Sequence, residues 1–446
     1  MTRWLYTLLM VLAQPFLRRK LVRRGRQEPG YLEAIEERFG HYSSPAREPK
    51  GMTVWIHAVS LGETRTAALL LAGLRESLPG MRLVFTHGTA TGRAEGARWL
   101  QAGDAQSWQP WDTPGAVQGF LRHFKPDIGL LMETEIWPNL VAGCQQAGVP
   151  LGLVNARMSE KSQKQAQRLA WLSRPAFAAL TAVYAQTALD AQRLLQLGAR
   201  VRGVTGNLKF DARPQADQLR RGQAWRRGLG RPVALFASSR EGEEAVLLDF
   251  LASFSPPALE GQAQAAINLI ATGVQWLIVP RHPQRFDAVA ALIENRGFKV
   301  SRRSAWADAP PDQSTSTAPV IWLGDSLGEM ALYYGLADVA LLGGSFEPLG
   351  GQNLIEAAAC ACPVVMGPHT FNFAEAAALA LAAGAAVQVA TLPEAVNTAC
   401  QLLGDPSART AMADAATAFS NAHRGAVEKT AAAIVSLLHQ QRVNAL

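Results

Sequence analysis

The stretch "TVWIHAVSLGETRTAALLLAGLRES", residues 53–77, joins an apolar run to an Ala- and Leu-rich segment with helical spacing. The apolar run is typical of a buried strand. The letters "SLGE" between the two parts match the Ser-x-x-Glu capping box, in which serine and glutamate satisfy backbone N–H groups at a helix start. The stretch therefore predicts a strand, a turn and a helix, in that order. A second "SLGE" occurs at residues 326–329, again after an apolar run, so a capped helix is predicted to begin there as well.

Further apolar runs alternate with helical segments along the chain. They form a first series at residues 53–59, 82–87, 127–132, 151–156 and 182–186, and a second at residues 233–238, 276–281, 320–324, 339–344 and 363–367. Strands that alternate with helices form parallel sheets covered on both faces, and 446 residues are too many for one core. The sequence therefore predicts an α/β protein of two doubly wound domains that face each other across a cleft.

The two series are separated by residues 206–232, which are polar, basic and without strand signals. We expect residues 27–210 to form the first domain and residues 211–446 the second. Residues 250–275 interrupt the second series and are typical of a small insertion or a long helical connection.

The positive charge of the chain is concentrated at its N-terminus. The net charge is +7, and residues 1–26 hold seven cationic side chains and no acidic one, so the remaining residues sum to zero. A nucleic-acid-binding protein spreads basic residues over a folded face, so this distribution argues against nucleic acid as a partner. Four scattered cysteines are too few for a disulfide framework and favour a reducing compartment.

Residues 1–26 are expected to anchor the protein to a membrane. Their apolar part, residues 4–17, is interrupted by Thr7, Gln14 and Pro15, and a spanning helix needs about 20 apolar residues. The basic residues follow the apolar part, which is the reverse of a signal peptide. We expect a shallow helix whose arginines bind anionic headgroups on the cytoplasmic side. The alternative is a buried first helix.

Acidic residues follow two strands of the first series, where ligands bind in sheets of this kind. Glu63 is either only a helix cap, which the residues alone favour, or a candidate general base. A helix N-terminus favours its charged form, so we expect an ionised but weak base at neutral pH. Glu133 and Glu135 share one face if the strand continues; they then either raise one another's pKa or pair with Arg93 or Arg157.

The second series carries a glycine-rich turn, "GGSFEPLGGQNLIEAAACACPVV", at residues 343–365. Its paired glycines allow the backbone to approach a ligand closely, and a helix expected to begin near Gln352 offers N–H groups to an anion. Glu356 can accept ribose hydroxyls, and Arg281 can balance a phosphate or a sugar carboxylate. The turn therefore indicates either a nucleotide site or tight packing of a helix on its strand. No dinucleotide fingerprint, Walker A motif or metal-ligand spacing occurs.

The ordered motifs resemble the 3-deoxy-D-manno-octulosonic acid (Kdo) transferases of lipopolysaccharide synthesis. They are "WIHAVSLGET" (55–64), "THGTATGR" (86–93), "METEIWPN" (132–139), "NARMSEKS" (155–162), "GNLKFD" (206–211), "PRHPQRF" (280–286), "LGDSLGEM" (323–330) and the long turn from residue 343 to residue 373. The resemblance implies a GT-B fold of two Rossmann-like domains, CMP-Kdo as donor, lipid IVA as acceptor, inversion without a metal ion or other cofactor, and the cytoplasmic face of the inner membrane.

The resemblance also implies roles for individual residues. Glu63 matches the general base, while Glu133 and Lys209 match residues that stabilise the transition state. The residues that match CMP-binding segments are Pro280, Arg281, Leu327, Gly328, Glu329, Asn353, Leu354, Ile355 and Glu356. The alternatives are another GT-B enzyme, such as a sugar-nucleotide 2-epimerase, and an inactive membrane scaffold.

Overall fold

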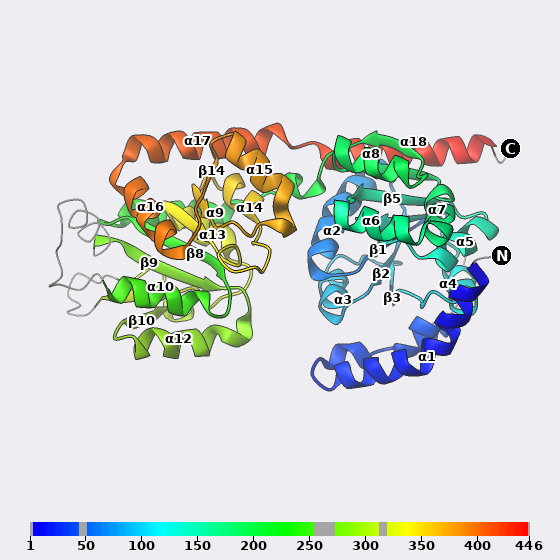
Figure 1. The fold of residues 1–446 in the computed structure, drawn as a ribbon, viewed down its shortest axis with the longest axis horizontal. Helices are drawn as coiled ribbons and strands as arrows, with labels where there is room; N and C mark the ends of the chain where they lie inside the picture. The colour runs from blue at the N-terminus through cyan, green and yellow to red at the C-terminus, as the bar shows by residue number, and fades with distance from the viewer. Residues whose placement is uncertain (1–2, 44–50, 254–272, 312–318, 445–446) are drawn as a thin grey trace. The chain divides into compact units, whose positions relative to one another are not determined.

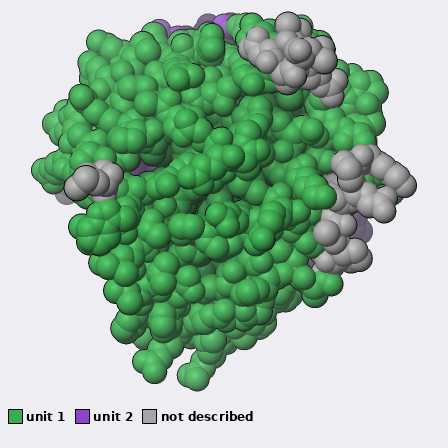
Figure 2. All heavy atoms as spheres, turned by 90° about the vertical axis from the view of Figure 1, so that its right-hand side faces the viewer, with its two compact units in different colours: residues 1–211, 423–446 green, residues 212–422 purple. Residues whose placement is uncertain are grey.

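The computed structural model describes residues 3–43, 51–253, 273–311 and 319–444. The chain divides into two compact units, which are coloured separately in Figure 2. Unit 1 contains residues 1–211 and 423–446, and unit 2 contains residues 212–422. The first boundary lies next to the one that the sequence predicts, whereas residues 423–446 fall in unit 1 and not, as we expected, with residues 211–422.

The C-terminal helix α18 (Ala426–Asn444) packs against unit 1. Its residues Ala431 and Ile434 are buried in the core cluster that also contains Leu70. The Asp211 carboxylate accepts backbone N–H bonds from Gly425 and Val427, each 2.6 Å long. Burial of the apolar face of α18 and these charge-assisted bonds explain why the chain returns to unit 1.

Unit 1 is built on a parallel sheet whose order among the described residues is β3-β2-β1-β4-β5-β6-β7 (Figure 1). Its strands are β1 (Thr53–Ala58), β2 (Arg82–His87), β3 (Ala105–Trp108), β4 (Ile128–Met132), β5 (Leu151–Ala156), β6 (Ala182–Ala185) and β7 (Val201–Val204). Its other helices are α1 (Arg3–Gly25), α2 (Leu61–Ser77), α3 (Ala90–Ala97), α4 (Pro114–Phe124), α5 (Pro138–Gln146), α6 (Glu160–Arg168), α7 (Ala170–Ala178) and α8 (Ala188–Gln196), with 3₁₀ turns η1 (Pro29–Leu32), η2 (Ile35–Phe39) and η3 (Leu208–Asp211).

Strand β1 shows why its sequence is apolar throughout. Successive side chains of a strand point to opposite faces. Trp55 packs into the core on one face of the sheet, and Val54 and Ile56 pack into the core on the other. Helices cover both faces (Figure 1), so every residue of β1 is buried.

Unit 2 has a second parallel sheet, with the order β10-β11-β9-β8-β12-β13-β14 among the described residues. Its strands are β8 (Val233–Ser239), β9 (Gln275–Pro280), β10 (Lys299–Arg302), β11 (Val320–Leu323), β12 (Val339–Leu342), β13 (Val364–Met366) and β14 (Ala386–Gln388). Its helices are α9 (Ala216–Gly228), α10 (Glu243–Ala252), α12 (Phe286–Asn295), α13 (Met330–Leu336), α14 (Leu354–Ala359), α15 (Ala374–Ala382), α16 (Leu392–Gly404) and α17 (Pro406–Ala422), with 3₁₀ turns η4 (Pro283–Arg285), η5 (Arg303–Ala305) and η6 (Phe371–Phe373). Most of the stretch at residues 250–275, namely 254–272, lies outside the described residues.

Helix α1 leaves most of its apolar side chains in solvent. Trp4, Leu8, Leu12 and Phe16 recur at every fourth position and are 62%, 45%, 61% and 71% exposed, so they form a stripe along one face of the helix. The helix buries Leu21 and its terminal glycine, which does not fit a buried first helix. Within the described ranges, none of the helices is both long and apolar enough to cross a bilayer.

Candidate active site

In both sheets the strand order reverses next to the first strand of the unit. The reversal lies between β1 and β4 in unit 1 and between β8 and β12 in unit 2. Ligands of open α/β sheets bind at the carboxyl ends of the strands that flank such a reversal. Glu63 and Glu133 follow β1 and β4, and Arg240 and Gly343 follow β8 and β12, so each unit presents polar groups at its reversal.

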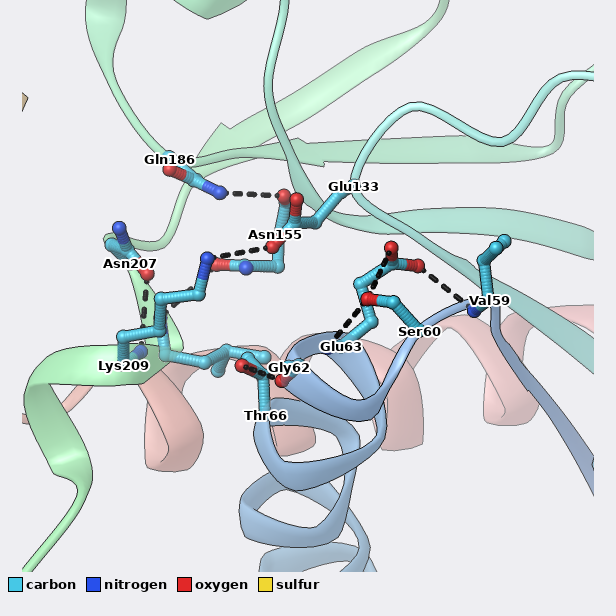
Figure 3. Close-up of polar contacts among 11 residues, drawn as sticks. Val59, Ser60, Gly62, Glu63, Thr66, Glu133, Asn155, Gln186, Asn207 and Lys209 are labelled. Carbon is cyan, nitrogen blue, oxygen red and sulfur yellow. Dashed lines mark hydrogen bonds and ion pairs between the residues drawn. The ribbon is translucent and has the colours of Figure 1, made fainter. Parts of the chain in front are cut away.

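The first "SLGE" forms a capping box at the start of α2. Ser60 is the N-cap, and its hydroxyl accepts the Glu63 N–H at 3.3 Å. The Glu63 carboxylate reaches back to the Val59 N–H at 2.9 Å and also accepts the Ser60 hydroxyl at 3.0 Å (Figure 3). The return bond therefore goes to the residue before the N-cap, and the capping role predicted for Glu63 is confirmed.

The sequence predicts that Glu63 is ionised at neutral pH, but capping does not keep it fully ionised. Burial raises the pKa of its carboxyl to about 7, and the negative charges of Glu133 and Glu135 add to the rise, although hydrogen bonds from Val59 and Ser60 oppose it. A general base is most effective when its pKa lies near the working pH. Glu63 thus has the acidity of an effective base, because burial outweighs the helix N-terminus.

Glu133 and Glu135 do not share a strand face, contrary to one expectation. Strand β4 ends at Met132, and Glu133 has a left-handed backbone with φ of 57°. Such a conformation costs a non-glycine residue roughly 1–3 kcal/mol and is concentrated at functional sites. Glu135 instead accepts the indole N–H of Trp137 at 2.8 Å.

Glu133 forms an ion pair with Lys209, whose amino group lies 2.9 Å from a carboxylate oxygen. The cation paired with Glu133 is thus Lys209, while the guanidinium of Arg93 pairs with Glu37. The pair joins the end of β4 to η3, residues that lie far apart in sequence. Glu63, Glu133 and Lys209 therefore meet in one region of unit 1 (Figure 3).

Asn155 holds η3 in place beside this region. Its side-chain oxygen accepts the Leu208 N–H at 3.0 Å, and its backbone oxygen accepts the amide of Gln186 at 2.9 Å. Asn155 is fully buried and has a left-handed φ of 50°. Asparagine tolerates this conformation better than most residues, and its short amide reaches the turn that carries Lys209. Asn155 opens the motif "NARMSEKS", but its role in holding η3 was not predicted from the sequence.

The second "SLGE" does not form a capping box. Helix α13 begins only at Met330, and Glu329 is an N-cap residue without a side-chain capping bond. The Glu329 carboxylate pairs with Arg303 at 2.9 Å and accepts the Ser326 hydroxyl. Between them, Gly328 has a φ of 79° and Leu327 is 74% exposed. The predicted helix start at this "SLGE" is therefore wrong by three residues.

The glycine-rich turn of unit 2 approaches other backbone closely. A side chain at Gly343 would meet the Ser238 oxygen at 2.4 Å, and Gly344 has a φ of 68°. The following helix α14 starts at Leu354, later than expected, with Asn353 as its N-cap. Leu354 and Ile355 are buried, so only their backbone is available to a ligand, while Glu356 is half-buried in the first turn.

Arg281 lies next to this turn. It follows Pro280, the buried last residue of β9, and its Nε donates to the Gln352 side chain at 3.2 Å. A side chain at Gly344 would lie 3.1 Å from the amide nitrogen of Gln352. Arg281 and the glycine-rich turn thus form one site, whereas Glu329 pairs with η5. Across the part of the chain that the structure describes, no three His, Cys, Asp or Glu side chains are grouped to hold a metal ion.

Comparison with known proteins identifies the family. The family model described as 3-deoxy-D-manno-octulosonic-acid transferase (kdotransferase) matches residues 33–212. The 3-deoxy-D-manno-octulosonic acid transferase of Bordetella pertussis is 45% identical over 96% of this chain and 98% of its own length. The chain belongs to the Kdo transferase family.

One more distant match is to a relative of the same family, and another is to a solved structure with a similar fold. The Kdo transferase of Haemophilus influenzae is 29% identical over 96% of this chain and 97% of its own length. The crystal structure of UDP-GlcNAc 2-epimerase from Neisseria meningitidis covers 87% of this chain and all of its own, with a TM-score of 0.55 and 15% identity. The second match shows a GT-B-like fold and nothing of the activity. This Kdo transferase therefore contains two parallel-sheet α/β units, and its fold resembles that of the epimerase.

Proposed function

We propose that this Kdo transferase moves Kdo from CMP-Kdo to lipid IVA, with inversion at the anomeric carbon and without a metal ion. The observation that carries the proposal is the Glu63 carboxyl, whose pKa of about 7 suits a general base and whose neighbours are Glu133 and Lys209. Glu63 accepts the proton of the acceptor hydroxyl while that oxygen forms a bond to the anomeric carbon and CMP departs.

Lys209 and Glu133 are proposed to stabilise the transition state. Their ion pair is partly buried, with 22% and 17% of the side chains exposed, so its charges act in a medium of lower polarity than water. The Lys209 cation can stabilise negative charge that develops on the oxygen leaving the anomeric carbon. The Glu133 charge raises the pKa of Glu63 and so strengthens the base.

The donor is proposed to bind unit 2 beside Arg281 and the glycine-rich turn. The departing CMP phosphate gains negative charge, which a nearby guanidinium stabilises. Backbone groups at Asn353–Glu356 and the half-buried Glu356 are proposed to contact the nucleoside. Leu327, Gly328 and Glu329, which match a CMP-binding segment of the family, are proposed to contact CMP as well.

Helix α1 is proposed to hold the enzyme on the cytoplasmic face of the inner membrane. Its exposed apolar stripe contains Trp4 and Phe16, and the basic residues of its last turns follow directly. An apolar face enters the region between headgroups and acyl chains, and the cations attract anionic lipid. A lipid acceptor is consistent with an active unit that carries such a helix.

The proposal is tested by mass spectrometry of lipid IVA after incubation with CMP-Kdo and the enzyme. We expect a mass gain of one or more Kdo residues, with the Glu63→Gln variant inactive but folded. An unchanged acceptor mass, together with epimerisation of a UDP-sugar, would support the 2-epimerase alternative. Inactivity of the wild-type protein on both substrates would support a membrane scaffold.

A further inference from the structure

Arg240 lies beside Arg281 at the strand reversal of unit 2. The register of β8 and β9 pairs Ser239 with Pro280, so the two arginines are the next residues of two adjacent strands. The Arg281 N–H donates to the Ser239 oxygen at 3.0 Å, which extends the pairing by one residue. Burial first, and then the positive charges of Arg240 and Arg281, lower the pKa of His282, which places both cations close to the same imidazole.

The backbone around Arg240 is fixed by a buried carboxylate. Glu243 is 1% exposed and accepts the Arg240 N–H at 2.8 Å and the Gly344 N–H at 2.8 and 2.9 Å. A side chain at Gly344 would lie 3.4 Å from Cγ of Arg240. Glu243 therefore ties the start of the Arg240 side chain to the same glycine-rich turn that adjoins Arg281.

The guanidinium of Arg240 has no counter-ion among the described residues. The neighbouring Arg285, by contrast, forms a bidentate pair with Glu244 at 2.7 and 3.1 Å. Arg240 is half-buried, so its guanidinium is available to an anionic ligand.

We infer that Arg240 binds the carboxylate of the Kdo group in the donor and so determines specificity for a sugar acid. The inference rests on the proposed function, in which Arg281 adjoins the CMP phosphate. CMP-Kdo carries two negative groups on its anomeric carbon, a phosphodiester and a carboxylate. Two adjacent arginines match two adjacent anions, and a planar guanidinium binds a carboxylate with two parallel hydrogen bonds. A nucleotide sugar without a carboxylate leaves Arg240 unpaired and is disfavoured.

The test compares CMP-Kdo with cytidine 5′-(methyl phosphate), a phosphodiester that lacks the carboxylate. For Arg240→Gln we expect KM for CMP-Kdo to rise at least about tenfold and the inhibition constant of the methyl ester to change less than about twofold. Arg281→Gln should raise both constants. Arg240→Lys keeps the charge and should recover part of the lost affinity.

Arg296→Gln is the matched control, because Arg296 pairs with Asp249 at 2.8 Å on a helical surface; it should leave both constants unchanged. Equal weakening of both ligands by Arg240→Gln, or no weakening of either, overturns the inference while the proposed function stands. A wild-type protein that does not use CMP-Kdo removes the proposed function, and this inference with it.

Discussion

The same four residues, Ser-Leu-Gly-Glu, follow a strand in each unit and form two different structures. In unit 1, Glu63 closes a capping box, and its charged neighbours are the carboxylates Glu133 and Glu135. In unit 2, Glu329 neutralises Arg303, and the helix begins after it. The motif therefore forms a turn in both units, whereas the charges around its glutamate differ: carboxylates lie near Glu63 and an arginine pairs with Glu329.

The strongest test of this comparison makes the same substitution in both "SLGE" motifs. We expect Glu63→Gln to lower turnover at least about 100-fold, because it removes the proton acceptor. Glu329→Gln should change turnover less than about tenfold and act mainly on KM for the donor. Steady-state kinetics with thermal melting as a folding control measure both effects. Equal losses of turnover would contradict the assignment of the base to unit 1.

A smaller effect is expected from substitutions of two residues with left-handed backbone, Asn155 in unit 1 and Ser238 in unit 2. Asn155→Gly keeps the conformation but removes the oxygen that binds the Leu208 N–H, so Lys209 shifts and turnover should fall about tenfold. Ser238 in unit 2 has a φ of 55°, and its hydroxyl has no hydrogen-bond partner among the described residues. Ser238→Gly is therefore the matched control and should change turnover less than about twofold.

A double variant separates positioning from general destabilisation. If Asn155 acts through Lys209, Asn155→Gly should add little to the loss already caused by Lys209→Ala. Fully additive losses would show that Asn155 acts by another route. The measurement is turnover in the four variants of the cycle, at a temperature at which all remain folded.

The pH dependence of the reaction should further distinguish the glutamates of the two "SLGE" motifs. Glu63 acts as a base only when ionised, so kcat/KM should rise with pH around a midpoint of about 7. Glu133→Gln removes a charge that raises the pKa of Glu63 and should lower the midpoint. Ser60→Ala removes a hydrogen bond that lowers this pKa and should raise it. Ser326→Ala, in the second "SLGE" motif, should leave the midpoint of the kcat/KM profile unchanged. A shifted midpoint in this variant would mean that Glu329 contributes to the pH dependence.

The smallest expected effect is on stability. Ser60→Ala removes a capping bond and should lower the free energy of unfolding by about 1 kcal/mol. Leu327 is exposed in the second "SLGE" motif, so Leu327→Ala should lower the free energy of unfolding by less than about 0.5 kcal/mol. Denaturant titration measures both values, and a smaller loss at Ser60 than at Leu327 would contradict the capping difference.

The central strands were predictable from sequence, and the edge strands were not. Strands β3, β7, β10 and β14 were missed, and each lies at an edge of its sheet. Edge strands are less buried, as the half-exposed β7 shows, so they lack the continuous apolar run that marks a strand covered on both faces. The packing of α18 on unit 1 was not predicted, because the pattern of an amphipathic helix does not indicate which of two cores the helix packs against.

The candidate site was predictable where a motif carries it. Glu63, Glu133 and Lys209 were found in long family motifs, and the structure brings them together. The pKa of Glu63 depends on burial by residues distant in sequence, so the pattern around it predicted the wrong ionisation. Asn155 and Arg240 are ordinary polar residues at strand ends, and only backbone geometry and strand register reveal their surroundings.

The packing of α18 on unit 1 also bears on synthesis of the chain. Unit 2 is continuous in sequence, whereas unit 1 lacks part of its core until residues after 422 leave the ribosome. The apolar surface around Leu70 stays uncovered during that interval, and Tyr184 lacks the Ala433 oxygen to which its hydroxyl donates. Because domains otherwise complete in N- to C-terminal order during translation, this chain should finish its second unit first, and a ribosome stalled before α18 should display a chaperone-binding first unit.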